Sequence, residues 1–326
     1  NTFWDQNYSA KEQRELHNFL WLTSIDRKDN ASTLRQIITL WNINNLKYKP
    51  LVWETSVISK RIISWILNSD IILKNCNFDF KRNFIESIII QTNHLKKNFK
   101  YEIDHKKKIE IITVLVLSGL VFKEYLENYE YSLRELEKLI NIFFDSDGFP
   151  VTRNPDDLLN YSKYLFLIRE VLKDAQKDIP DFLEIILEKN LECLKKITTP
   201  VNTLPLFNGS VENDLTNFYN YLNHFNIKIK KTKNNPGNIY ILKNKKDIIY
   251  FEAGNPPKKN YSSCYQSGPL SFEYFLENNK IITNSGFGIN ISNKARLFSR
   301  LTSSQSTLYL NDTSIVEFEK SNMMNK

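Results

Sequence analysis

The stretch IYILKNKKDIIYF, residues 239–251, decides the fold class of this chain. Two short apolar runs, Ile239–Leu242 and Ile248–Phe251, flank its polar centre NKKD. Short β-branched and aromatic runs separated by a few turn-forming residues predict a β-hairpin. Two more hairpins are predicted at Leu270–Thr283 and Thr307–Phe318. About six or seven strands in total are expected, which would form the first part of an antiparallel β-sandwich.

Upstream of this region the apolar residues recur at helical spacing. Val57, Ile58, Ile62 and Trp65 are one example, and spacings of three and four residues predict amphipathic helices. The loops between the predicted helices are short, which favours antiparallel neighbours. This run of antiparallel helix hairpins fits a bundle, a solenoid or a toroid.

Turn-forming residues mark several of the helix ends. Ser132 is expected to cap a helix that begins at Leu133, with Glu135 completing a capping box. Asn154 is expected to cap the following helix, which would begin at Pro155.

The order of the elements predicts separate domains, because helices precede strands instead of alternating with them. The expected fold class is α followed by β, with an incomplete (α/α) toroid of antiparallel helix hairpins before the sheet. We place the helical domain at residues 1–199 and a linker rich in Asn, Pro and Gly at residues 200–237. The linker includes one short helix at Leu215–His224, and the β-sandwich domain occupies residues 238–326.

The composition restricts the function classes. The net charge of +7 is compatible with a polyanionic partner, but also with a chain that is rich in lysine throughout. No recognised nucleic-acid-binding motif accompanies the charge, so no nucleic-acid partner is predicted. No apolar run reaches the ~18 residues of a membrane span, and Ile109–Phe122 is expected to be a buried helix. The three cysteines and four histidines show no disulfide or metal-ligand spacing.

Seven segments, in the same order along the chain, resemble motifs of the bacterial heparinase II/III-like family. They are LHNFLWL (16–22), the segment from Lys49-Pro50 to RIISWI (61–66), DGFPVTRNP (147–155), LPLFNGS (204–210), FEAGNPP (251–257), SGPLSFEYFLENNKIITNSG (267–286) and SSQSTLYLNDTS (303–314). The resemblance implies an (α/α) toroid followed by an antiparallel β-sandwich. It also implies a polysaccharide lyase that cleaves uronate-containing chains by β-elimination.

The lyase's titratable residues are replaced at the positions that match. The resemblance places the family's Asn-His pair at Lys106-Lys107, and its active-site Tyr at Asp157. Its two sandwich histidines correspond to Gln266 and Gln305. A glutamine is neither an acid nor a base at neutral pH, although it can hydrogen-bond a sugar. Some members of the family bind a divalent metal in the sandwich, but its histidine ligands are absent at these positions, so no cofactor or metal is predicted.

The candidate site residues follow from this correspondence. The predicted catalytic residues are Arg153, Asn154, Tyr161, Gln266 and Gln305, and the predicted substrate-binding residues are Lys106, Lys107, Asn208 and Tyr265.

Other roles remain open for these residues. Tyr161, Tyr164 and Tyr265 are the nearest replacement bases, and His105 is another if the correspondence shifts by about two positions. Purely structural roles are a helix cap for Asn154, a turn for Asn208-Gly209, and a solvated helix face for Lys106–Lys108.

Two functions are predicted. The first is a polysaccharide lyase acting on an acidic glycan, with impaired or altered chemistry. The alternative is a non-catalytic protein that binds an acidic glycan or assists in assembling an envelope polysaccharide. The periplasm or cell envelope is the expected location, with the cytoplasm as the alternative because no signal peptide is visible. Nothing in the sequence indicates an oligomeric state.

Overall fold

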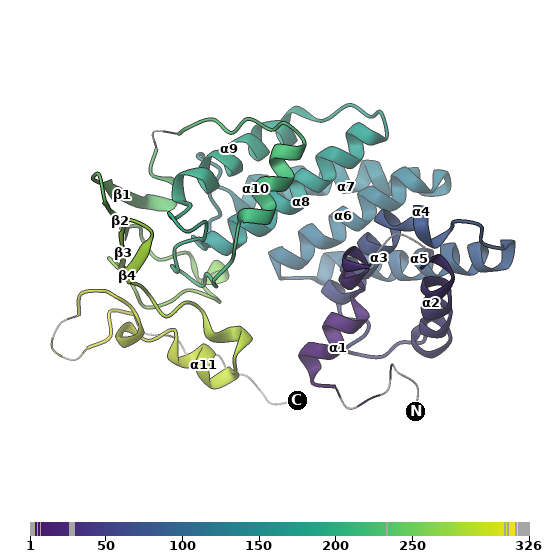
Figure 1. The fold of residues 1–326 in the computed structure, drawn as a ribbon, viewed down its shortest axis with the longest axis horizontal. Coiled ribbons are helices and arrows are strands. Elements are labelled where there is room, and N and C mark those ends of the chain that lie inside the picture. The colour runs from purple at the N-terminus through teal and green to yellow at the C-terminus, as the bar shows by residue number, and fades with distance from the viewer. Residues whose placement is uncertain are drawn as a thin grey trace. The chain divides into compact units, whose positions relative to one another are not determined.

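The computed structural model describes residues 4, 6, 8–25, 30–232, 234–309, 311, 313–316 and 318. Among these residues all α-helices but one precede the strands, as the periodicity predicts, and one short helix follows them (Figure 1). The α-helices are α1 (Ala10–His17), α2 (Ala31–Asn45), α3 (Thr55–Leu67), α4 (Ser69–Ile72), α5 (Phe78–Asn98), α6 (His105–Val121), α7 (Leu126–Phe143), α8 (Pro155–Asp174), α9 (Asp181–Ile197), α10 (Thr216–His224) and α11 (Asn293–Phe298). The strands are β1 (Ile239–Lys243), β2 (Asp247–Glu252), β3 (Phe272–Leu276) and β4 (Asn279–Ile282).

The contacts divide the chain into two compact units. Unit 1 comprises residues 1–139 and 167–178, and unit 2 comprises residues 140–166 and 179–326. This division reflects contacts in the folded chain, whereas the predicted boundaries at residues 199 and 237 mark changes of secondary structure. The predicted domain boundaries therefore stay a prediction.

In unit 1, helix α6 is buried along most of its length. Eleven consecutive residues, Ile109–Gly119, are buried, which confirms the buried helix expected there. A Cβ at Gly119 would lie 2.5 Å from the backbone nitrogen of Tyr129, so a glycine is needed for this close approach. No helix among the described residues has the length and apolarity required to cross a membrane.

An aromatic cluster forms a second part of the unit 1 core. Phe19, Trp41 and Trp65 are fully buried, and the ring centroids of the two tryptophans are 5.4 Å apart in an edge-to-face arrangement. His17 is also buried, and its Nδ1 accepts a hydrogen bond of 3.1 Å from Trp41 Nε1. These residues are core residues in this structure.

One predicted helix start is wrong. Helix α7 begins at Leu126, so Ser132 lies inside the helix and is not its cap. The Ser132 hydroxyl donates instead to the carbonyl of Tyr129 at 2.8 Å. Such a bond to the preceding turn satisfies a serine inside a helix, and for that reason the capping-box pattern did not mark a terminus.

In unit 2, four antiparallel strands are hydrogen-bonded in the order β1-β2-β3-β4. This confirms the two hairpins predicted at 239–251 and 270–283, and the short helix α10 matches the one predicted before them. The third predicted hairpin includes Leu310, Asp312 and Glu317, which lie outside the described residues. The described residues between 307 and 318 add no strand to this sheet.

The buried face of the sheet is both apolar and acidic. Tyr250 and Glu252 alternate with more exposed residues on β2, and Glu273 and Phe275 do the same on β3. Tyr250 lies opposite Glu273 in the register, so the four side chains share one face. Two carboxylates therefore lie at one end of the buried face, beside a Tyr250–Phe275 aromatic pair.

Candidate functional site

The start of helix α8 positions the first candidate residues. The Asn154 side-chain oxygen accepts a hydrogen bond of 2.9 Å from the Asp156 backbone N–H, and Pro155 is the first helical residue. This confirms the predicted cap. The preceding residue, Arg153, has a φ of 59°, a left-handed conformation that is uncommon for residues other than glycine and asparagine.

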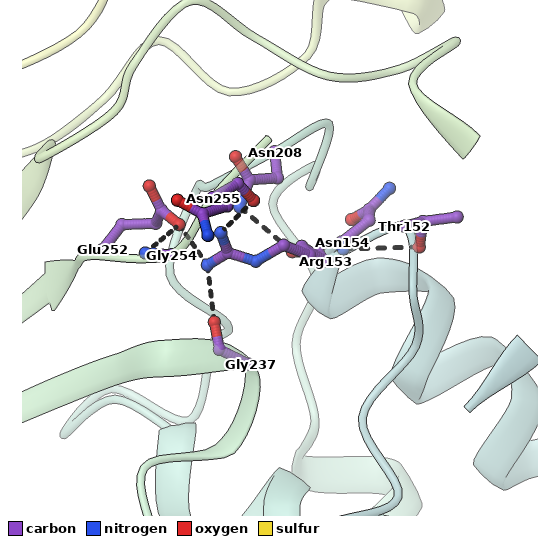
Figure 2. A network of polar contacts seen from close by, with 8 residues as sticks. All are labelled: Thr152, Arg153, Asn154, Asn208, Gly237, Glu252, Gly254 and Asn255. Carbon is purple, nitrogen blue, oxygen red and sulfur yellow. Dashed lines mark hydrogen bonds and ion pairs between the residues drawn. The ribbon is translucent and has the colours of Figure 1, made fainter. Parts of the chain in front are cut away.

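Protein oxygens surround the Arg153 guanidinium group. Figure 2 shows it pointing toward Glu252, Gly237 and Asn255. Nη2 forms an ion pair with the Glu252 carboxylate and donates to the Gly237 carbonyl at 2.5 Å, and Nη1 donates to the Asn255 carbonyl at 2.6 Å. A Cβ at Gly254 would lie 1.9 Å from the guanidinium carbon, so the neighbouring chain can pass only because this residue is glycine.

Burial dominates the electrostatics of this cluster. It raises the pKa of Glu252, because the charged carboxylate loses its hydration, while Arg153 opposes that rise. Burial also raises the pKa of Tyr265, and the charge of Glu252 adds to the effect. Within the described part of the chain, Arg153 Nε, Glu252 Oε2 and the Tyr265 hydroxyl are buried and have no hydrogen-bond partner.

The segment Leu204–Ser210, which we call the site loop, is fastened to its surroundings at successive residues. The Asn208 side chain donates to the Arg153 carbonyl at 3.2 Å, and its proximity to Glu252 opposes the rise of that residue's pKa. The Gly209 N–H donates to the side-chain oxygen of Gln266 at 2.9 Å. Asn208 and Gly209 both have positive φ angles, of 54° and 100°. The predicted Asn208-Gly209 turn is thus present, and three predicted site residues meet there.

The two glutamines that match the family's histidines converge on one acceptor. Gln266 Nε2 and Gln305 Nε2 donate to the carbonyl of Ser299 at 2.7 and 2.8 Å. Gln266 Nε2 also donates to the Gly286 carbonyl at 2.9 Å. Gln266 is 1% exposed, whereas Gln305 is partly exposed.

This arrangement does not fit the metal that some members of the family bind. Both donors of the Gln266 amide are given to carbonyl oxygens, and its oxygen already accepts the Gly209 N–H. Carboxamide nitrogens are not metal ligands, whereas the imidazoles that they replace are. No group of three or more His, Cys, Asp or Glu residues in the described ranges is placed to hold a metal ion.

The remaining candidates are placed differently. Tyr161 is fully buried, and its ring stacks on Phe143 with centroids 4.5 Å apart. Lys106 and Lys107 lie in the first turn of α6 in unit 1 and are partly exposed. The structure thus links Arg153, Asn154, Asn208, Tyr265, Gln266 and Gln305 within unit 2. The roles predicted for all nine residues stay predictions.

Two residues of this network, Glu252 and Glu273, were not among the predicted site residues. Glu273 is buried and accepts from the Thr283 hydroxyl at 2.7 Å and from the Asn284 N–H at 3.2 Å. The backbone N–H of Leu206, in the site loop, also stabilises its charged form. Both glutamates occupy inward positions of strands that the alternation of apolar residues predicts. A carboxylate at such an inward position is the sequence signal that could identify them.

Comparisons with known proteins give the same fold. The structure is similar to a crystal structure of heparinase III, with a TM-score of 0.75 and 18% identity, covering 96% of this chain and 57% of that one. It is also similar to a mutant of heparan sulfate lyase HepC from Pedobacter heparinus, with a TM-score of 0.68 and 17% identity, covering 94% and 55%. The chain thus spans somewhat more than half the length of these structures. No curated protein sequence matches it.

The family comparison agrees with the motifs. Residues 233–326 match the family described as heparinase II/III-like, C-terminal. The fold class predicted from the sequence is confirmed, since the helices and antiparallel sheet together match heparinase III. The resemblance found in the sequence is therefore confirmed: residues 233–326 match the heparinase II/III-like C-terminal family, and the chain has the fold of heparinase III.

Proposed function

We propose that this chain binds a uronate-containing anionic polysaccharide of the heparan sulfate class, and that its β-elimination activity is reduced or altered. The similarity to heparinase III over 96% of the chain supports binding of this class of substrate. The observation that carries the reduced chemistry is the pair of carboxamides, Gln266 and Gln305, hydrogen-bonded to the Ser299 carbonyl. Activity in the periplasm or cell envelope belongs to the same proposal.

The chemistry explains why these carboxamides matter. β-Elimination needs a cation to offset the uronate carboxylate, a base to remove the C5 proton and an acid to protonate the leaving oxygen. Neither Gln266 nor Gln305 can exchange a proton at neutral pH. Lys106 and Lys107 still carry positive charge, and they are partly exposed. The chain therefore retains groups that attract the polymer and lacks two groups that would transfer protons.

Exposure divides the candidate residues into two sets. Lys106, Lys107 and Gln305 are partly exposed and are proposed to contact the glycan. The Arg153 guanidinium group is hydrogen-bonded to protein oxygens. Together with the other buried candidate residues, Arg153 is proposed to hold the surrounding segments in place.

Titration of the protein with heparan sulfate at low and high salt tests the binding. We expect binding that weakens with salt, because screening reduces the attraction between lysines and a polyanion. Lys106→Gln with Lys107→Gln should weaken it, whereas Lys47→Gln, an exposed lysine outside the matched motifs, should not. Absence of binding at low salt would overturn the proposal.

A turnover assay separates the two candidate functions. The ultraviolet absorbance of unsaturated uronate measures β-elimination directly. Weak turnover supports an impaired lyase, and binding without turnover supports the non-catalytic alternative, which the two carboxamides favour. Rapid turnover would contradict the reduced chemistry while leaving the binding intact.

A further inference from the structure

The carboxamide of Gln266 joins three segments that are far apart in the sequence. Its oxygen accepts from Gly209 in the site loop, and its nitrogen donates to Gly286 and to Ser299. Gly286 follows β4, and Ser299 directly follows α11. The side chain is 1% exposed, so water does not compete for these bonds. One buried amide therefore uses both of its donors and its oxygen in bonds that fix the three segments relative to one another.

Gln305 depends on the same arrangement. It shares the Ser299 carbonyl with Gln266, and its side chain packs so closely on Gly268 that a Cβ there would lie 3.0 Å from Gln305 Cγ. The position of the partly exposed Gln305 is therefore set by a carbonyl that Gln266 holds.

We propose that Gln266 is a positioning residue that holds the site loop and, through the Ser299 carbonyl, places Gln305 for contact with the glycan. The proposal rests on the proposed function in one respect, which is that Gln305 contacts the bound polysaccharide. The fastening of the loop does not depend on that function.

Position 266 requires a side chain that both accepts and donates hydrogen bonds, as an amide does. A carboxylate of the same shape could still accept the Gly209 N–H, but it has no proton for the carbonyls of Gly286 and Ser299. Three oxygens would then face one another without hydrogen atoms between them, in a place that water does not reach. Gln266→Glu therefore removes two of the three links when its carboxyl is charged, and one of them when it is protonated, with almost no change of volume.

Asn190→Asp is the matched control in the same unit. Asn190 is fully buried in α9, and its Nδ2 donates to the Gly148 carbonyl at 2.6 Å. This variant also replaces a buried amide by a carboxylate that faces a carbonyl. It lowers stability by the same chemistry without touching the site loop, Gly286 or Ser299.

Hydrogen exchange followed by mass spectrometry tests the fastening. In Gln266→Glu we expect faster exchange in residues 204–210 and 284–288, and in Asn190→Asp we expect no change there. Unchanged exchange of the site loop in Gln266→Glu would overturn the proposal. Because this measurement needs no ligand, it remains decisive even if the protein does not bind heparan sulfate and the proposed function fails.

A double-mutant cycle on heparan sulfate affinity tests the positioning. Gln266→Glu should weaken binding about tenfold, the effect of losing hydrogen bonds of ordinary strength. Gln305→Ala should also weaken it, and the double variant should be little weaker than Gln266→Glu alone. Asn190→Asp should bind with wild-type affinity at a temperature where it is folded. Additive effects of Gln266→Glu and Gln305→Ala would show that Gln266 does not act through Gln305.

Discussion

Arg153 and Glu252 form a buried ion pair although they are 99 residues apart in the sequence. The pair connects the residue before the α8 cap to the end of strand β2. Asn208 lies beside the pair, and its side chain donates to the Arg153 carbonyl. The stability of unit 2 should therefore be sensitive to this pair.

Removing one partner should cost more than removing both. Arg153→Met leaves the Glu252 carboxylate buried without its cation, and loss of one partner of a buried pair costs about 3–5 kcal/mol. The double variant Arg153→Met/Glu252→Leu leaves no unpaired charge and should be less destabilised than Arg153→Met. Urea unfolding measures the free energies, and a double variant at least as destabilised as Arg153→Met would contradict this account.

Gly254→Ala should destabilise unit 2 through the same pair. The added Cβ would lie 1.9 Å from the guanidinium carbon of Arg153, so the side chain would have to leave its ion pair. Overpacking of this kind costs about 1–3 kcal/mol. In an Arg153→Met background the same substitution should cost less, because the fixed guanidinium is gone. An equal loss in both backgrounds, measured by urea unfolding, would show that Arg153 is not the cause.

The buried carboxylate of Glu273 should affect how stability depends on pH. Burial raises its pKa above the ordinary value of 4.5, although Lys280 and the hydrogen bond from Thr283 oppose the rise. A raised pKa means that the folded state binds the proton more tightly, so this contribution to stability is present below about pH 4.5 and is lost as the pH rises through the raised pKa.

Glu273→Gln tests the sign of this effect. From about pH 5 to pH 7 the unfolding free energy of the wild type should fall relative to that of the variant, because the carboxamide does not titrate. Urea unfolding at several pH values gives the comparison. A difference that changes in the opposite direction, or does not change, would contradict the pKa shift.

Arg61 should be important for the stability of unit 1. It is fully buried, its Nε donates to Gln91 at 2.7 Å, its Nη1 donates to the His17 carbonyl at 2.8 Å, and its guanidinium lies 4.2 Å from the Trp41 ring centroid. Lysine keeps the charge but cannot reproduce this planar set of contacts. Arg61→Lys should cost about 1.5–3 kcal/mol, the range for hydrogen bonds to charged groups. Arg82→Lys, at an exposed arginine, is the control and should leave urea unfolding nearly unchanged.

The elements of the fold were predictable because their signals are local. The alternation in 239–251 identified β1 and β2, and Asn154-Pro155 identified the start of α8. The Ser132 prediction failed because a serine can bond to the preceding turn within a helix as well as cap one. The structure joins the site loop to Gln266 through the Gly209 N–H, while the site roles inferred from the motifs stay predictions.

The sequence by itself determined the periods of the helices and strands, the turn residues and the order of the motifs, because each is encoded by neighbouring residues. Only the tertiary structure decided that Arg153 is engaged by Glu252, that Gln266 is buried while Gln305 is partly exposed, and that both glutamines share the Ser299 carbonyl. The physical reason is that burial and hydrogen-bond partners depend on segments brought together by folding, and no local pattern specifies which donor meets which acceptor.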